Sequence, residues 1–237
     1  MKRWAIFVEG QTEQLFVERL IKSIAGTKQV SLIKQKASGG NKNNRSFLEI
    51  SAGSENETEY YVLVVDCGSD GSVKSDICDQ FENLSKAGYQ KIIGLRDVYP
   101  KVLRNDINKL RIGLAMGLPS GSPSILFVLC VMEIEAWILA EDSHYPRFNS
   151  EITADRVNVA LGFDIVNDDL SQRNNPAKDL ADVYWLESIP YDKSAAIIER
   201  VLNALDFERL GTVVRSKFKD LDLLYCELSS FFSAPTG

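Results

Sequence analysis

The chain contains 237 residues, of which 45% are hydrophobic and 25% are charged. These proportions exclude a disordered, collagen-like or coiled-coil protein, and the length fits one α/β domain with a helical addition. The four cysteines lie far apart and form no CxxC pair, which argues against a disulfide framework and a thiolate zinc site. Because His144 is the only histidine, a catalytic metal would have to be held by carboxylates, which points to Mg²⁺ or Mn²⁺.

Charge is distributed unevenly along the chain. The net charge is −6, but residues 1–50 contain nine Lys and Arg against four acids, so this segment carries +5 and the rest −11. A basic N-terminal segment on an acidic protein suits contact with a polyanion, and we expect Lys42 and Arg45 to guide a phosphate backbone. The alternative is an ordinary solvated surface.

No targeting or membrane segment is expected. The opening MKRWAIFVEG lacks the apolar stretch and the cleavage site of a signal peptide, and the longest apolar run, residues 125–132, is too short to span a bilayer. The expected location is the cytoplasm, with no membrane partner.

The first half of the chain alternates between apolar runs and striped helices. Residues 4–8 form a predicted buried strand, and residues 12–25 form a helix that ends at Gly26. The polar segment at residues 38–46 is expected to be a loop. Residues 60–65 form an unbroken apolar run, which is typical of a central parallel strand.

This alternation continues to about residue 140. A helix striped by Ile77, Phe81 and Leu84 is followed by a strand at residues 91–95. A helix striped by Leu103, Ile107, Leu110 and Leu114 comes next, then a strand at residues 125–131 and a helix at 134–140. Repeated strand–helix units predict an α/β fold with a mostly parallel sheet flanked by helices.

From about residue 150 the pattern is helical only. Helices are predicted at residues 176–186, 194–205 and 218–231, the first with Asn175 as its N-cap. The predicted division is an α/β core at residues 1–145 and a helical C-terminal region at residues 146–237 that packs on the core.

Acidic residues follow the predicted strands. They are Glu9, Asp66, Asp97, Glu133 and Glu135. The carboxyl ends of parallel strands meet at one edge of a sheet, where such folds bind ligands. Carboxylates gathered there repel one another unless a cation lies among them, so a divalent metal site is the predicted use. The alternative is structural, since loops are polar and acids cap helices.

Glu133 and Glu135 are two residues apart, so a strand would point both the same way and a helix would separate them by about 200°. Glu135 could instead be a first-turn acid of a helix.

Several other residues have two possible roles each. Arg96 could hold a phosphate or pair with its neighbour Asp97. Glu13 is expected to be structural, and the alternative is that it faces the acidic cluster and supports it. Capping is expected for Asp70 and Asp76. The remaining expectations concern burial: His144 exposed, and three aromatic residues in the core, namely Trp137, Tyr184 and Trp185.

Four segments resemble Toprim domains of the overcoming-lysogenization-defect type of nuclease, and a family of small bacterial proteins with a Toprim-like core. They are VEGQTEQLFVERLI from Val8, VVDCGSDG from Val64, GLRDVYP from Gly94 and VMEIEAWIL from Val131. The resemblance covers about residues 3–140. It implies that Glu9 is catalytic and that Asp66, Asp97, Glu133 and Glu135 bind metal. The chain departs from the usual Asp-x-Asp turn, because Asp66 and Asp70 are separated by three residues.

The resemblance implies a Mg²⁺- or Mn²⁺-dependent nuclease acting on DNA or RNA, in defence against phage or mobile DNA, with a partner ATPase or a second copy of the chain. One alternative is a non-catalytic binding or regulatory subunit of a defence complex. Another is an α/β phosphohydrolase of a different fold family, which would keep the metal and change the substrate.

Overall fold

The computed structural model describes residues 1–40, 43–53, 58–69, 71–99 and 101–233. The chain divides into two compact units that are interleaved along the sequence. Unit 1 contains Met1–Arg96, Asn105–Leu129 and Cys226–Gly237, and unit 2 contains Asp97–Arg104 and Cys130–Tyr225. The sequence prediction divided the chain only once, near residue 145. Each unit is considered by itself below.

Unit 1 is built on a six-stranded sheet with the order β3-β2-β4-β1-β5-β6. The strands are β1 (Lys2–Val8), β2 (Val30–Gly40), β3 (Asn43–Ser51), β4 (Tyr60–Asp66), β5 (Lys91–Asp97) and β6 (Ser124–Cys130). β1 pairs in parallel with β4 and β5, β4 pairs in parallel with β2, and only the β2–β3 pair is described as antiparallel. The predicted α/β fold with a mostly parallel sheet is confirmed.

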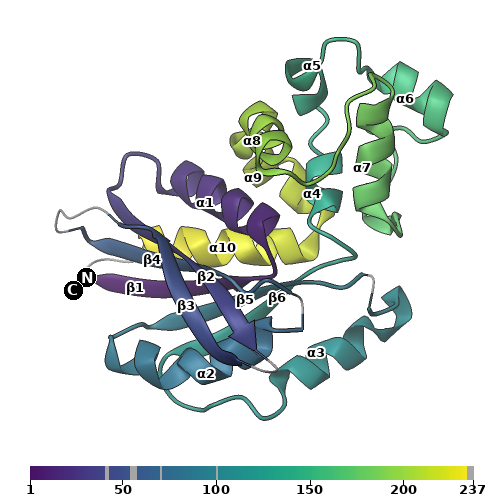
Figure 1. Cartoon of the computed structure of the whole chain (residues 1–237). Coiled ribbons are helices and arrows are strands. Elements are labelled where there is room, and N and C mark those ends of the chain that lie inside the picture. Colours follow the sequence, from purple (N-terminus) through teal and green to yellow (C-terminus); the bar gives the residue numbers. More distant parts are fainter. Residues whose placement is uncertain (41–42, 54–57, 70, 100, 234–237) are drawn as a thin grey trace. The chain divides into compact units, whose positions relative to one another are not determined.

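Helices cover both faces of this sheet. Figure 1 shows α1 (Gln11–Ala25) on one face and α2 (Val73–Lys86) on the other. α3 (Ile107–Ala115) follows a single 3₁₀ turn at Arg104–Asp106, and α10 (Lys219–Ser233) ends the described chain. As predicted, α1 ends at Gly26, whose φ of 60° is a backbone conformation that favours glycine.

The core of unit 1 explains why its central strands are apolar throughout. In β1 and β4 nearly every residue is buried, because helices cover the sheet on both sides. In β5, Gly94 is required by close packing: a Cβ there would lie 2.6 Å from a ring carbon of Phe127. Any larger side chain would force that ring or the sheet to move.

The prediction of a loop at residues 38–46 is wrong for the described residues of that range, which exclude residues 41–42. The structure has a β-hairpin there, formed by β2 and β3. The sequence is polar because much of the hairpin is exposed, and β2 ends with two glycines of positive φ, Gly39 at 81° and Gly40 at 125°. Since Lys36 is the β2 residue in register with the last residue of β4, the hairpin extends beyond the end of that strand.

Unit 2 is helical in its described residues. Its helices are α4 (Glu135–Leu139), α5 (His144–Phe148), α6 (Ala154–Leu161), α7 (Pro176–Trp185), α8 (Ala195–Ala204) and α9 (Phe207–Thr212), with 3₁₀ turns at Leu170–Gln172 and Val214–Lys217. The predicted cap is confirmed: the Asn175 side chain accepts a hydrogen bond from the Lys178 amide, and Pro176 begins α7.

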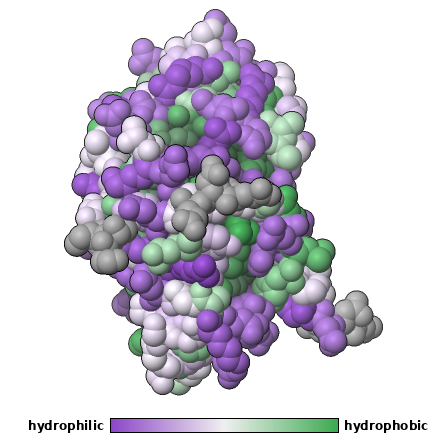
Figure 2. Space-filling view, turned by 90° about the vertical axis from the view of Figure 1, so that its left-hand side faces the viewer, coloured by the Kyte–Doolittle hydropathy of each residue, from purple (hydrophilic) through white to green (hydrophobic). Residues whose placement is uncertain are grey.

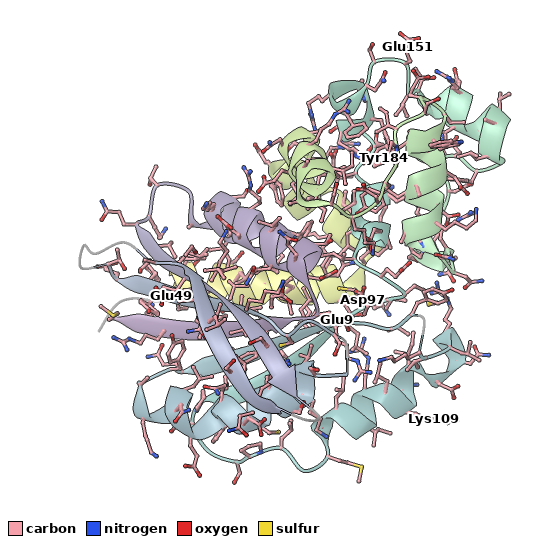
Figure 3. The ribbon with its side chains drawn as sticks, viewed as in Figure 1. Glu9, Glu49, Asp97, Lys109, Glu151 and Tyr184 are labelled. Carbon is pink, nitrogen blue, oxygen red and sulfur yellow. The ribbon has the colours of Figure 1, made fainter. Side chains whose placement is uncertain are left out.

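The predicted burial of several side chains needs correction. His144 is fully buried, with Nε2 2.8 Å from Tyr184 Oη, and burial lowers its pKa to about 4. Its polar neighbours in the sequence gave no sign of this. Trp137 and Tyr184 are in the core as predicted, and Figure 3 labels Tyr184 within unit 2. Trp185, next in the chain, is 64% exposed, since each residue of a helix is turned by about 100° around the axis from the one before it.

α3 also differs from its prediction. Leu114 is the only buried residue of this helix, and Leu103, expected in its apolar stripe, lies before the helix and is 71% exposed.

The surface is mostly polar where Figure 2 shows it. Hydrophilic residues cover most of that face, and hydrophobic residues form smaller areas between them. Among the described helices, none is long and apolar enough to cross a membrane.

Candidate functional site

The five predicted acids are divided between the units. Glu9 and Asp66 belong to unit 1, whereas Asp97, Glu133 and Glu135 belong to unit 2; Figure 3 labels Glu9 and Asp97. Their convergence on one site therefore stays a prediction. Within the described ranges, no group of three or more Asp, Glu, His or Cys side chains forms a ready metal site. What each acid can do depends on the groups that hold it within its own unit.

In unit 1, Glu9 and Asp66 follow neighbouring strands. Val8 of β1 is in register with Asp66 of β4, and the Cys67 amide donates to the Val8 carbonyl at 2.9 Å. Asp66 is buried and accepts a hydrogen bond from the Gly68 amide at 2.8 Å, whereas Glu9 is half-buried. Because α1 and α2 leave these two strands toward opposite faces, this is the switch point at which open α/β sheets bind ligands.

The first turn of α1 adds two buried polar groups: Gln14, which sequence reasoning did not identify, and Glu13, which it expected to be structural. Gln14 is almost fully buried, and its Nε2 donates to the carbonyls of Gln35 at 2.9 Å and Val64 at 3.0 Å. The side chain thus fastens α1 to β2 and β4. Glu13 is also buried, and its Oε2 lies 3.3 Å from where a Cβ on Gly10 would be. The sequence signal that could have revealed this role is a polar side chain at a helix position that faces the sheet.

Arg45, predicted to contact substrate, is engaged within unit 1. Its Nε and Nη2 donate to the two carboxylate oxygens of Asp76, and Nη1 and Nη2 also donate to the carbonyls of Gly39 and Cys67. The guanidinium therefore fastens the hairpin to the turn after β4 and to α2. Asp76 is buried in this ion pair instead of acting as the expected cap.

The other basic and turn residues predicted from the sequence give little information about the acidic residues of the site. Lys42 and Asp70 lie outside the described residues. Arg96 is half-buried, and its Nε has no hydrogen-bond partner.

A cavity of about 660 Å³ lies beside the Arg45–Asp76 pair. The hairpin, the turn after β4 and the start of α2 line it with mainly small polar residues, including Ser38, Ser69 and Ser75. Since Asp76 neutralises the arginine, the cavity offers no uncompensated positive charge from that side chain.

In unit 2, hydrogen bonds join the segments that follow β5 and β6. The Val98 amide lies 3.2 Å from the Cys130 carbonyl and 3.1 Å from that of Met132, and the Tyr99 amide donates to Met132 at 2.8 Å. Asp97 accepts from the Ile134 amide at 3.2 Å. Met132 has a φ of 71°, a strained conformation for a residue with a side chain, and it directly precedes Glu133.

Glu133 is a buried carboxylate with an unfavourable environment. Its Oε2 accepts a hydrogen bond from the Ala177 amide in the first turn of α7, at 3.0 Å. Burial is the main cause that raises the pKa of Glu133, and the charges of Glu135 and Asp179 raise it further, while Lys193 lowers it. Burial therefore disfavours the ionised form of Glu133.

Glu135 is fully buried at the first position of α4. Its Oε1 accepts from Tyr191 Oη at 3.1 Å and lies 2.7 Å from Lys193 Nζ, but its Oε2 is buried without any hydrogen-bond partner. An unsatisfied buried carboxylate oxygen is costly and calls for an explanation. Sequence reasoning missed Tyr191 and Lys193, because neither lies near a predicted strand end.

Glu133 and Glu135 are the residues of unit 2 whose surroundings leave room for a further positive charge. Glu133 comes just before α4, so the two glutamates do not share one strand or one helix. Glu135 is an acid of the first helical turn, as the sequence alternative predicted. Two buried carboxylates, one with a raised pKa and one with an orphaned oxygen, are hard oxygen donors in need of positive charge. Asp97 is a further acid of this unit and accepts a hydrogen bond from the Ile134 amide, but among the described residues no three such acids form a ready metal site.

No family model matches the chain, and no curated protein or solved structure matches it. The fold and the site therefore define only a general class of protein, an α/β protein with a mostly parallel sheet and buried acidic residues. We call the buried acids Asp97, Glu133 and Glu135 the unit 2 acidic site.

Proposed function

We propose that the protein is a Mg²⁺- or Mn²⁺-dependent nuclease or a related phosphodiester hydrolase. The observation that carries the proposal is the orphaned Oε2 of Glu135 beside Glu133, whose pKa is raised. This arrangement is expensive without a bound cation and is satisfied by one.

Each acid has a proposed role. Glu133, Glu135 and Asp97 would hold the cation, and Asp66 is a further candidate ligand on unit 1. A bound divalent cation supplies charge neutralisation at a phosphate and an activated water. Glu9, half-buried after β1, would accept the proton of the attacking water.

A nucleic-acid substrate is supported by charge. The N-terminal segment has a surplus of +5, and Lys36 is exposed on the hairpin. Action in phage defence, a cytoplasmic location and a partner ATPase or second copy belong to the same proposal and derive from the sequence resemblance and the composition.

A second candidate is the non-catalytic binding module. One observation favours it: Glu133 and Glu135 already have internal partners, the Ala177 amide for one and Tyr191 with Lys193 for the other. Carboxylates with a purely structural role, which join α4, α7 and the segment before α8, would have internal partners of the same kind. Such a role does not explain why Oε2 of Glu135 has no hydrogen-bond partner.

Cleavage assays separate the two candidates. Supercoiled plasmid and single-stranded RNA are incubated with wild type, Glu133→Gln, Asp97→Asn and Glu9→Gln in Mg²⁺ and in Mn²⁺. Glu82→Gln, a change at an exposed position of α2, is the matched control. We expect the three site variants to lose roughly 100-fold or more of the activity while the control keeps it.

Thermal unfolding of the same proteins completes the test, because the site variants should be at least as stable as wild type. Folded wild type that cleaves neither substrate with either cation would favour the binding module.

A further inference from the structure

Arg96, near the end of β5, is a half-buried arginine without a partner in the part of the chain that the structure describes. Its Nε is buried and has no hydrogen-bond partner. No hydrogen bond or ion pair joins the rest of its side chain to a described residue either, so the pair with Asp97 that the sequence allowed is not formed. A group with five N–H donors therefore lacks an acceptor.

This state is costly for a guanidinium. The group stays charged at every ordinary pH, so it cannot escape the cost of burial by releasing a proton. A buried N–H without an acceptor loses its bond to water and gains nothing in return. Arg45 shows the ordinary solution in the same unit, because its guanidinium donates to Asp76 and to two carbonyl groups. An acceptor from outside the chain would satisfy Arg96 in the same way.

Arg96 and Glu9 are at the same level of the unit 1 sheet. Phe7 of β1 is in register with Gly94 of β5, and Glu9 and Arg96 each follow two residues later. Phe7 belongs to a core cluster that includes residues of α2, and a Cβ on Gly94 would lie 2.9 Å from Ile77 of α2. Side chains two residues apart in a strand share a face, so Arg96 is on the α2 side. Glu9, labelled in Figure 3, follows β1 at the carboxyl edge, where open α/β sheets bind ligands.

The missing acceptor fits an oxyanion. The Nε–H and one Nη–H of a guanidinium point the same way and match two oxygens of a phosphate or a carboxylate. A phosphodiester offers two non-bridging oxygens and one negative charge. One such group would therefore give Nε its acceptor and compensate the charge of Arg96, and it is the group on which the proposed enzyme acts.

We propose that Arg96 binds a phosphodiester group of the nucleic-acid substrate through Nε and Nη. This inference rests on the proposed function, adds a substrate-binding residue to it and requires no metal ligand. The bound phosphate lies on the side of the sheet edge that Glu9 follows, within the reach of a group proposed to accept the proton of the attacking water. Arg96 thereby takes the part that Arg45, engaged with Asp76, cannot take.

Binding of a labelled single-stranded oligonucleotide, as DNA and as RNA, is measured by fluorescence anisotropy with EDTA present. We expect Arg96→Met to bind about tenfold or more weakly than wild type, with a salt dependence lower by about 0.7 in slope, since one phosphate contact is lost. Arg96→Lys should lie between them, because an ammonium keeps the charge and loses the planar pair of donors. Lys86→Met, which removes the same charge from an exposed position of α2, is the control and should bind as wild type does.

Thermal unfolding distinguishes binding from a structural role. Because the guanidinium has no partner to lose, Arg96→Met should unfold at the temperature of wild type or above it. An arginine that holds the fold together would give a lower temperature. Early unfolding of both Arg96 variants would overturn the inference.

The Nε–H signal of Arg96 in NMR spectra reports on the proposed contact itself. It is identified as the signal that Arg96→Lys lacks. Inorganic phosphate should shift this signal in wild type, and acetate at equal ionic strength should shift it much less, because phosphate carries more charge and more acceptor oxygens. An unmoved signal, or equal shifts with both anions, would contradict a phosphate site.

Failure of this inference is distinguishable from failure of the proposed function. If Arg96→Met binds the oligonucleotides as wild type does, or if wild type binds neither, Arg96 is not a phosphate-binding residue. Cleavage of plasmid by wild type and Arg96→Met with the same KM would overturn the inference and leave the nuclease standing. If binding depends on Arg96 but wild type cleaves neither plasmid nor RNA in Mg²⁺ or Mn²⁺, the nuclease is wrong and the phosphate contact stands.

Discussion

The two units each bury a carboxylate against a basic side chain, and they do so differently. In unit 1, Arg45 donates to both oxygens of Asp76 and to two carbonyl groups, so the pair is fully satisfied. In unit 2, Lys193 and Tyr191 share one oxygen of Glu135 and the other has no partner. Both carboxylates are almost completely shielded from water.

This difference separates a structural ion pair from a candidate binding site. A planar guanidinium matches both carboxylate oxygens, so nothing remains at Asp76 for a ligand. The Lys193 ammonium and the Tyr191 hydroxyl leave Oε2 of Glu135 without a hydrogen-bond partner, and the charge of Glu135 acts on a second buried acid, Glu133. Burial alone therefore does not distinguish the two sites; the state of the second oxygen does.

The largest expected effect is on the stability of unit 1. Arg45→Met leaves Asp76 buried without its partner, so the free energy of unfolding should fall by about 3 kcal/mol or more. Arg45→Lys should restore little, since an ammonium cannot make the same set of bonds. Urea denaturation measures both, with Lys86→Met, which changes an exposed pair on α2, as the control. A fall no larger than that of the control would show that this pair is not structural.

A smaller effect concerns pH and His144 in unit 2. Burial lowers its pKa from 6.5 to about 4, so the unfolded state binds a proton more readily than the folded state. Stability is complete above pH 6.5 and should be lost as the pH falls toward 4, by up to about 3 kcal/mol. His144→Gln cannot titrate and should lack this portion of the acid dependence. Equal acid dependence of wild type and variant in urea titrations would contradict the assignment.

Glu133 should give the opposite trend with pH. Its pKa is raised above the ordinary 4.5, so the folded state holds the proton more strongly. Its contribution to stability is present below pH 4.5 and is lost as the pH rises through the folded pKa. Glu133→Gln should therefore be relatively more stable than wild type at neutral pH than at pH 4. Thermal unfolding across this range measures the difference, and Mn²⁺ should reduce it in wild type.

Much of the fold followed from local patterns in the sequence. The continuous apolar runs of β1 and β4 predicted buried central strands, and Asn175 before Pro176 predicted the start of α7. The hairpin of β2 and β3 was missed, because an exposed antiparallel pair has no apolar run to mark it.

The candidate site was predictable only in part. The acids after the strands could be named, since strand ends are local features. Their partners could not: Lys193 is 58 residues from Glu135, and Arg45 is 31 residues from Asp76. These contacts depend on tertiary packing, and no periodicity or spacing in the sequence indicates them.

Calorimetric titration of Mn²⁺ into wild type and Glu135→Gln tests the central claim most directly. If the unit 2 acidic site holds a divalent cation, wild type binds Mn²⁺, and Glu135→Gln loses most of that affinity while its thermal stability stays near that of wild type or rises. If Glu135 is instead a structural partner of Lys193, the variant binds Mn²⁺ as wild type does and unfolds at a lower temperature. That result would contradict the account.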